Sequence, residues 1–188
     1  MNFSIIVCAY NEESVIKRCL ESISAIDFPL EKFEIIVVNN ESNDNTEIIV
    51  KDFFSKNQRI NVQYLLIHHE VLSTARNAGI YHSNFDYIVF IDADAIVDKN
   101  ILNEYQKTYS KSEIDFSGGK ILLLNKESSV ANFFQKTRFK QIFEIGKYKE
   151  QLIGANMSFK KKLFIEDGGF PNMLSRGDDT FIRNRFMN

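Results

Sequence analysis

Three short stretches of the chain are apolar at almost every position, and they constrain the fold more than any other feature. They read FSIIVCA from residue 3, FEIIVV from residue 33 and YIVFI from residue 87. Each is short and rich in β-branched residues, which is typical of a buried strand. A strand with one wet face would alternate polar and apolar residues, so we expect these strands to be covered on both faces.

Helical patterns separate the apolar stretches. One apolar face at helical spacing comprises Val15, Ile16, Cys19, Leu20, Ile23 and Ile26. A weaker strand is expected over 61–67, a short helix over 73–82, and another helix that follows Asp98 and includes Leu102. Strands that alternate with helices predict an α/β fold, Rossmann-like, with a mainly parallel sheet covered by helices on both faces.

The pattern changes after residue 110. A strand is expected over 114–124, with Gly118 and Gly119 marking a bulge or a close approach, and a helix over 130–145. A strand-like segment covers 153–159, and a helix begins at Thr180 without being completed by Asn188. We expect a single domain over 1–188, in which 111–188 is a small subregion built onto 1–110 and cut short at its C-terminus.

Charge and cysteine content exclude several classes of protein. The net charge of −2 provides no basic surface for a nucleic-acid backbone, so no nucleic-acid partner is expected. The chain has only two cysteines, Cys8 and Cys19, both in apolar patterns, which fits a reducing compartment. No apolar run reaches the ~18 residues that span a bilayer, and the N-terminus lacks a signal peptide. A cytoplasmic location is therefore expected.

Polar side chains cluster where three predicted strands end. They occupy residues 10–13, residues 39–44, and the pair Asp92 and Asp94 with Ala93 between them. Ligands of open α/β sheets bind beyond the carboxyl ends of the strands. We therefore expect the three clusters to converge on one ligand site.

The two aspartates need a counter-charge. Carboxylates this close repel each other, and an apolar strand end strengthens the repulsion. A hard divalent cation such as Mg²⁺ or Mn²⁺ suits carboxylate oxygens and could bridge them to a phosphate. The alternative is an acidic turn that caps the next helix, but Asp98 already suits that position.

Six motifs, in order and at compatible spacing, resemble the family 2 glycosyltransferases. They are SIIVCAYNEE, EIIVVNNESNDNT, STARNAGI, FIDADAIV, LIGANMSFKK and GGFPNMLSRGDDTFIRNR. The resemblance covers essentially the whole chain. It implies the GT-A fold and an inverting transfer of a sugar from a nucleotide sugar, with a divalent cation, Mn²⁺ or Mg²⁺, as cofactor.

The resemblance also implies roles for individual residues. The nucleotide-sugar site would comprise Ala9, Tyr10, Glu12, Asn39, Asn40, Arg76, Asp92, Ala93 and Asp94. Asp94 would bind the metal directly, and Asp92 would contact the ribose or the metal shell. The acceptor or the donor sugar would meet Gly154, Ala155 and Asn156. Asp179 would be the catalytic base, with Asp178 beside it.

Two motifs depart from the family pattern, and simpler roles compete at several positions. Relatives usually carry an aspartate where this chain has Asn39 and Asn40, which weakens the expectation of uracil, and hence of a UDP-linked donor. Relatives usually have Glu-Asp where Asp178 and Asp179 stand. The competing roles are N-capping by Asn11, a solvated helix face for Arg76, and helix capping by the late acidic pair.

Three functions remain open from the sequence. The first is a metal-dependent transferase acting on a hydroxyl of a glycan or lipid-linked acceptor, with peripheral attachment at the inner membrane face as an option. The second is a truncated, non-catalytic module that binds nucleotide. The third is a phosphatase of the haloacid dehalogenase type, because FIDADAIV also resembles its nucleophile motif. That motif usually follows the first strand, whereas here it follows the fourth. The oligomeric state cannot be read from the sequence.

Overall fold

The computed structural model describes residues 1–111, 113–122, 154–166, 168–171 and 181. Within them, six strands form one sheet in the order β3-β2-β1-β4-β6-β5. The strands are β1 Phe3–Ala9, β2 Phe33–Asn39, β3 Asn61–Leu66, β4 Tyr87–Ile91, β5 Phe116–Gly118 and β6 Asn156–Lys160. The helices expected over 130–145 and from Thr180, like Asp178 and Asp179, lie outside the described residues.

The first four strands run parallel, as the apolar stretches predicted. β1 pairs in parallel with β2 on one side and β4 on the other, and β2 pairs in parallel with β3. β6 then runs antiparallel to β4, and β5 antiparallel to β6. The sheet is therefore mainly parallel, as expected, with a mixed edge contributed by the second part of the chain.

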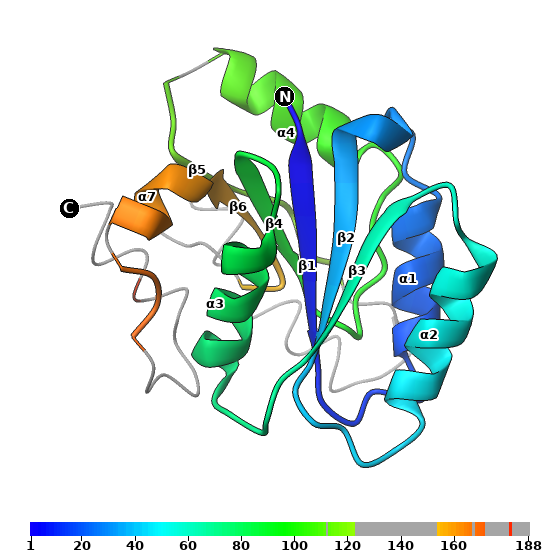
Figure 1. Cartoon of the computed structure of the whole chain (residues 1–188). Helices are drawn as coiled ribbons and strands as arrows, with labels where there is room; N and C mark the ends of the chain where they lie inside the picture. The colour runs from blue at the N-terminus through cyan, green and yellow to red at the C-terminus, as the bar shows by residue number, and fades with distance from the viewer. Residues whose placement is uncertain (112, 123–153, 167, 172–180, 182–188) are drawn as a thin grey trace.

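Helices cover both faces of the sheet (Figure 1). On one face α1 Ile16–Ser24, α2 Thr46–Lys56 and α4 Ile101–Lys111 pack against a core that includes Phe3, Ile5 and Val7. On the other, α3 Leu72–His82 and α7 Lys161–Glu166 pack against a core that includes Ile6. A short 3₁₀ turn, η1 Leu30–Lys32, precedes β2. The continuous apolar runs arise because both faces of these strands are buried.

A glycine allows α3 to approach the sheet closely. A Cβ at Gly79 would lie 2.5 Å from Cγ2 of Ile6, a separation that packed atoms do not adopt. Helix α3 therefore rests directly on β1. This contact fixes the height above the sheet of the side chains that precede Gly79 on the same helix.

The start of the first helix differs from the expectation. N-capping by Asn11 was one of the competing roles, but α1 begins at Ile16, five residues further on. Asn11 has a positive φ of 56°, and its Oδ1 accepts a hydrogen bond of 2.8 Å from the amide of Asn43. Asn tolerates this left-handed conformation better than most residues. The prediction was wrong because a distant loop, not the helix, holds the Asn11 side chain.

The strand expected over 114–124 is also shorter within the described residues. β5 covers only Phe116–Gly118, and residues 119–122 are not strand. The amide of Gly119 still donates to the carbonyl of Asn156 at 3.1 Å, but a Cβ at Gly119 would lie 2.1 Å from Nδ2 of Asn156. Here the glycine marks a close approach, which was one of the two readings expected for it.

A buried carboxylate fastens the amino ends of the strands. Glu34, on β2, is fully buried. Its Oε1 accepts from the Ser4 hydroxyl and the Asn84 amide, each at 2.6 Å. Its Oε2 accepts from the side chains of Gln63 and Asn84, each at 2.8 Å. A buried carboxylate is stable only when its lone pairs are satisfied in this way, so the network links β1, β2, β3 and the segment that leads into β4.

No helix among the described residues is both long and apolar enough to cross a membrane.

We expect Glu34→Gln to lower the free energy of unfolding by about 2 kcal/mol, because the new amide group faces donors that it cannot satisfy. Asp52→Asn provides the control, since the Asp52 carboxylate is exposed and pairs with Lys56, one helical turn away. Such pairs contribute ~0.5 kcal/mol or less. Urea unfolding of both variants measures the difference. Equal losses would show that Glu34 does not hold the strands together.

Candidate functional site

The polar clusters converge as predicted. Strands β1, β2 and β4 are parallel neighbours, so their carboxyl ends lie at one edge of the sheet. Strand β6 is antiparallel to β4, with Ile91 opposite Asn156. The turn at Gly154 and Ala155, which precedes β6, therefore lies beside the residues that follow β4. Both parts of the chain contribute to this edge.

The loops after β1 and β2 are joined by hydrogen bonds. The amide of Asn11 donates to Oγ of Ser42 at 3.0 Å, and the amide of Glu12 donates to Oγ1 of Thr46 at 2.8 Å. The amide of Glu13 donates to Asp44 at 3.0 Å, and the Glu13 carboxylate accepts from the amide of Asn45 at 2.9 Å. The two loops thus form one continuous border of the site.

The two asparagines after β2 use their side chains inside the protein. Asn39 donates to the Tyr64 hydroxyl at 2.8 Å and accepts from the amide of Ser42 at 2.9 Å. Asn40 donates to the carbonyl of Glu70 at 2.7 Å and accepts from its amide at 2.9 Å. A ligand could engage only the lone pairs and amide hydrogens that these bonds leave over.

An aromatic pair stands beside these loops. The ring of Tyr10, which is 42% exposed, lies 4.4 Å from the ring of His69 between centroids. The backbone amide of His69 donates to Glu41 at 2.8 Å, which anchors the loop that carries the imidazole. Ala9 precedes Tyr10, but its side chain is buried in the core. The sequence contains no local signal of the contact between His69 and Tyr10.

Arg76 is buried at the centre of this edge. Its side chain is 4% exposed, and Nη2 lies 3.4 Å from Oδ1 of Asp92 and 3.2 Å from the carbonyl oxygen of Gly154. The guanidinium also lies over the ring of Phe90, 4.8 Å from its centroid. The alternative role for Arg76 as part of a solvated helix face is therefore wrong. A cation this deeply buried requires such partners.

Gly154 leaves room for the guanidinium. A Cβ at this position would lie 2.8 Å from Nη2 and 2.9 Å from Nη1 of Arg76. The glycine is needed because the turn before β6 passes directly over the cation. Gly154 therefore acts on the site through its backbone, by its carbonyl oxygen and by its lack of a side chain.

The two aspartates differ in their surroundings. The Asp92 side chain is 46% exposed and faces Arg76, whereas Ala93 is buried and Asp94 is exposed. The carbonyl of Asp92 accepts from the amide of Ala95 at 3.0 Å and from the Cys19 thiol at 3.6 Å. This turn presents the Asp94 carboxylate to solvent, while Asp92 stays in contact with the buried cation.

Negative charge accumulates around Glu12. Burial, and then the charges of Asp94, Asp44 and Asp92, raise the pKa of Glu12 above its ordinary value of 4.5. These carboxylates come from the loops after β1, β2 and β4. Together they give this edge of the sheet, here called the acidic edge, a negative charge that Arg76 only partly offsets. A diphosphate, which is also negative, would be repelled by these carboxylates unless a cation lay between them.

The residues present fit a hard divalent cation. Carboxylate oxygens are its preferred ligands, and Mg²⁺ usually takes one or two carboxylates and completes its shell with water and phosphate oxygens. Asp92 and Asp94 match that pattern. In the described part of the chain, no group of three or more His, Cys, Asp or Glu side chains could hold a metal by itself. An all-protein metal cage is therefore absent from those residues.

Thiol chemistry does not suit this site. Burial raises the pKa of Cys8 and of Cys19, each to about 12. A thiol with that pKa is protonated at neutral pH, and only the thiolate is a strong nucleophile. Both cysteines are free and serve as packing residues under the site.

Asn77 extends the site toward the second part of the chain. Its Nδ2 donates to the carbonyl of Phe170 at 2.8 Å, and its Oδ1 accepts from the amide of Phe170 at 2.9 Å. Gly168 and Gly169, both at positive φ, turn the chain toward this clamp. The sequence placed Asn77 beside Arg76 in one motif but contained no signal of this pairing. Asp179, predicted as the base, and Asp178, predicted as its neighbour, lie outside the described residues.

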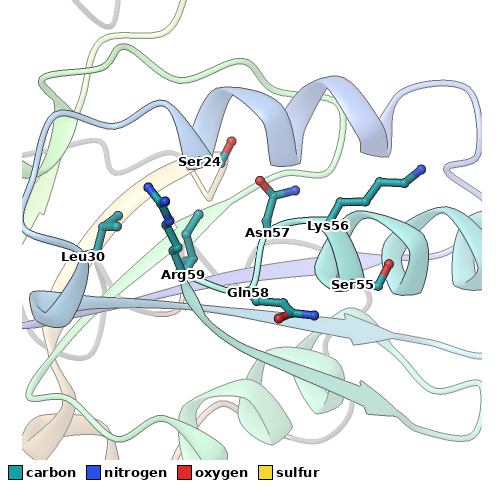
Figure 2. A pocket seen from close by; sticks show the side chains of 8 residues that line it. Ser24, Leu30, Ser55, Lys56, Asn57, Gln58 and Arg59 are labelled. Carbon is teal, nitrogen blue, oxygen red and sulfur yellow. The ribbon is translucent and has the colours of Figure 1, made fainter.

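A cavity elsewhere does not share this chemistry. It has a volume of about 450 Å³ and is bounded by Ser24, Leu30 and residues 55–60. Figure 2 shows that its side chains come from the end of α1, from η1, from the end of α2 and from the segment between α2 and β3. These segments lead into β2 and β3, so the cavity lies at the amino ends of the strands. The acidic edge lies at the other end.

Glu12→Gln is expected to stabilise the protein at neutral pH. The pKa of Glu12 is raised in the folded state, so its ionisation costs stability as pH rises through that pKa, and the cost vanishes below pH 4.5. The gain in unfolding free energy over the parent should therefore disappear in acid. Urea unfolding at neutral pH and at a pH below 4.5 measures the difference in unfolding free energy between the variant and the parent. The exposed Glu21, 3.9 Å from Lys17, provides Glu21→Gln as control. A gain independent of pH would contradict the assigned charge repulsion.

Comparison with known proteins places the chain among sugar transferases. The family model described as "Glycosyl transferase family 2" matches residues 4–168. A glycosyltransferase of Haloferax volcanii, AglE, is 30% identical over 190 residues, which cover 97% of this chain and 60% of that protein. The chain thus spans less than two thirds of this relative's length.

Solved structures share the fold. The structure of Staphylococcus aureus TarS 1–349 in complex with UDP has a TM-score of 0.75 and 21% identity, covering 97% of this chain and 54% of that one. A mannosyltransferase from Pyrobaculum calidifontis, in complex with GDP-Man and Mn²⁺, has a TM-score of 0.80 and 22% identity, covering 99% and 51%. The expected GT-A fold, with helices on both faces of the sheet, is confirmed.

Proposed function

The chain belongs to glycosyl transferase family 2, and from that premise we propose that it is the catalytic part of a metal-dependent, inverting glycosyltransferase. The observation that carries the proposal is the contact of Asp92 with the buried Arg76, with the exposed Asp94 two residues further on, at the carboxyl ends of β1, β2 and β4. It combines carboxylates for a cation with a guanidinium for phosphate oxygens. We take residues 1–188 as a single domain, because β5 and β6 extend the sheet that residues 1–110 begin.

The proposed donor is a nucleoside diphosphate sugar, with UDP as the preferred nucleotide. Tyr10 offers its exposed ring to the base, and Glu12 lies near the ribose in this scheme. TarS was solved with UDP and with UDP-GlcNAc, whereas the mannosyltransferase was solved with GDP-Man. Asn39 and Asn40 leave both bases chemically feasible, because an amide has donors and acceptors.

Asp94, with Asp92 beside it, would hold Mn²⁺ or Mg²⁺ against the diphosphate. When bound, the cation stabilises the negative charge that develops on the departing nucleoside diphosphate. Arg76 contributes a second, permanent positive charge, and its planar group suits phosphate oxygens. Asp92 keeps that guanidinium oriented, at 3.4 Å, before any ligand arrives.

The transfer itself would be a single displacement. The acceptor hydroxyl attacks the anomeric carbon, the bond from that carbon to the diphosphate oxygen breaks, and configuration inverts. Asp179 takes the hydroxyl proton as general base, and Asp178 orients the acceptor. Gly154, Ala155 and Asn156 would line the sugar. The proposed acceptor is a hydroxyl of a glycan or a lipid-linked glycan, and peripheral attachment to a membrane remains part of this hypothesis.

The phosphatase alternative loses its basis. Its nucleophile motif usually follows the first strand of the sheet, whereas Asp92 follows β4 and pairs with a buried arginine. The alternative of a binding module that does not catalyse transfer stays open, because the chain spans 60% of the length of AglE. That module would bind nucleotide without transferring sugar.

Asp94→Asn is expected to abolish metal-dependent nucleotide binding, because an amide is a far weaker ligand for a hard cation. Calorimetric titration with UDP and GDP, in Mn²⁺ and in chelator, measures this. Asp98→Asn is the matched control, since Asp98 lies in the turn before α4, where its carboxylate accepts from the amide of Asn100 at 2.8 Å. An asparagine oxygen can accept the same hydrogen bond. Equal binding by Asp94→Asn and the parent would show that the metal assignment is wrong.

Asp179→Asn is expected to retain nucleotide binding and to lose sugar transfer by a factor of roughly 10²–10⁴, the usual contribution of a general base. Donor turnover, followed as release of nucleoside diphosphate, measures the loss, and calorimetry on the same sample confirms binding. Transfer at a rate close to that of the parent would place the base elsewhere. Binding without turnover in the parent itself would favour the binding module.

A further inference from the structure

A buried tyrosine on α4 holds the first residue of β6. The hydroxyl of Tyr105 donates to Oδ1 of Asn156 at 2.5 Å, and Tyr105 is only 4% exposed. Burial raises the pKa of Tyr105 well above its usual range, so the hydroxyl keeps its proton and remains a donor. This contact joins residues 51 positions apart. The carbonyl end of the Asn156 amide is therefore occupied.

A glycine holds the other end of the same amide. A Cβ at Gly119 would lie 2.1 Å from Nδ2 of Asn156, so the amide nitrogen rests directly against the Gly119 backbone. The Gly119 amide donates to the Asn156 carbonyl at 3.1 Å, which fixes the two backbones relative to each other. The side-chain amide thus lies between a phenol and a glycine. Its orientation is defined, with oxygen toward Tyr105 and nitrogen toward Gly119.

The amide nitrogen remains available to a ligand. Within residues 1–111, 113–122, 154–166 and 168–171, Nδ2 of Asn156 donates to no protein atom. It is also not sealed from solvent, because Ser73 Oγ is the one fully buried side-chain polar atom without a partner in that part of the chain. The amide oxygen already accepts a hydrogen bond, and the amide nitrogen is accessible, so this side chain can donate a hydrogen bond to an oxygen of a ligand.

The position of Asn156 places this donor beside the acidic edge. Asn156 lies opposite Ile91, the residue before Asp92. It follows Gly154, whose carbonyl accepts from the buried Arg76, by two positions. Asn156 is therefore at the same edge of the sheet as Asp92 and the turn that contacts Arg76.

We propose that Nδ2 of Asn156 donates a hydrogen bond to an oxygen of the donor sugar, and that Tyr105 is a positioning residue that fixes the amide for this bond. The inference rests on the proposed function and goes beyond it by assigning roles to Tyr105 and Gly119. Without the phenol, the amide can rotate and turn its nitrogen away from the sugar oxygen, so the proposed hydrogen bond is weakened.

The test compares nucleotide with nucleotide sugar. Calorimetry in Mn²⁺ measures the affinity of UDP and of UDP-GlcNAc, and of GDP and GDP-mannose, for the parent and its variants. Tyr105→Phe should leave the affinity for the nucleoside diphosphate unchanged and weaken that for the sugar conjugate by about fivefold, the effect of one hydrogen bond. Gly119→Ala should have the same selective effect, because its Cβ displaces the amide.

Tyr109→Phe is the matched control. Tyr109 lies one turn further along α4, and its hydroxyl bonds to Oγ of Ser158 at 3.1 Å. Both variants lose one buried hydroxyl, so a general loss of stability would affect them alike. Tyr109→Phe should bind UDP and UDP-GlcNAc as the parent does. If both variants lose sugar affinity equally, Tyr105 has only a structural role.

A double variant separates positioning from direct contact. In the background of Asn156→Ala, Tyr105→Phe should cause no further loss of sugar affinity, because its effect passes through the amide. An additional loss would overturn the assignment of Tyr105 as a positioning residue. Unchanged preference for the sugar conjugate in Tyr105→Phe would overturn the inference alone. Failure of the parent to bind any of the four nucleotides would overturn the proposed function and the inference with it.

Discussion

The described site depends on one buried cation. Removing a guanidinium from water is costly unless close partners replace the lost hydration. Arg76 finds these partners in the carboxylate of Asp92, the carbonyl of Gly154 and the ring of Phe90. They belong to the end of β4 and to the turn before β6, and Arg76 itself belongs to α3. The cation therefore holds together the elements from both parts of the chain that border the acidic edge.

The sequence was sufficient for the layers of the fold because burial leaves a local signature. A strand that is covered on both faces has apolar residues throughout, and β1, β2 and β4 match that pattern within one residue of the expected limits. The convergence of polar loops followed from parallel strand order alone. The half-exposed edge strand β3 gave a weaker pattern for the same physical reason, since only part of it is buried.

Contacts between distant residues were beyond that reasoning. Asparagine is a residue type that often caps helices, but the Asn11 side chain accepts a hydrogen bond from a loop 32 positions away. Tyr105 and Glu34 occupy positions expected for a core residue and for a strand residue, and each becomes a specific hydrogen-bond partner through residues that the sheet brings together. Such pairings depend on register and on helix height above the sheet. No local pattern encodes them.

The clamp between Asn77 and Phe170 has a consequence for exchanging parts between related enzymes. Asn77 bonds to the backbone amide and carbonyl of Phe170, so these two hydrogen bonds do not depend on the side chain at position 170. It does require the left-handed turn of the two preceding glycines, and a Cβ at Gly169 would lie 2.9 Å from Oδ1 of Asn77. A chimera that keeps the glycine pair could therefore receive a foreign segment after residue 170 without altering the helix that carries Arg76.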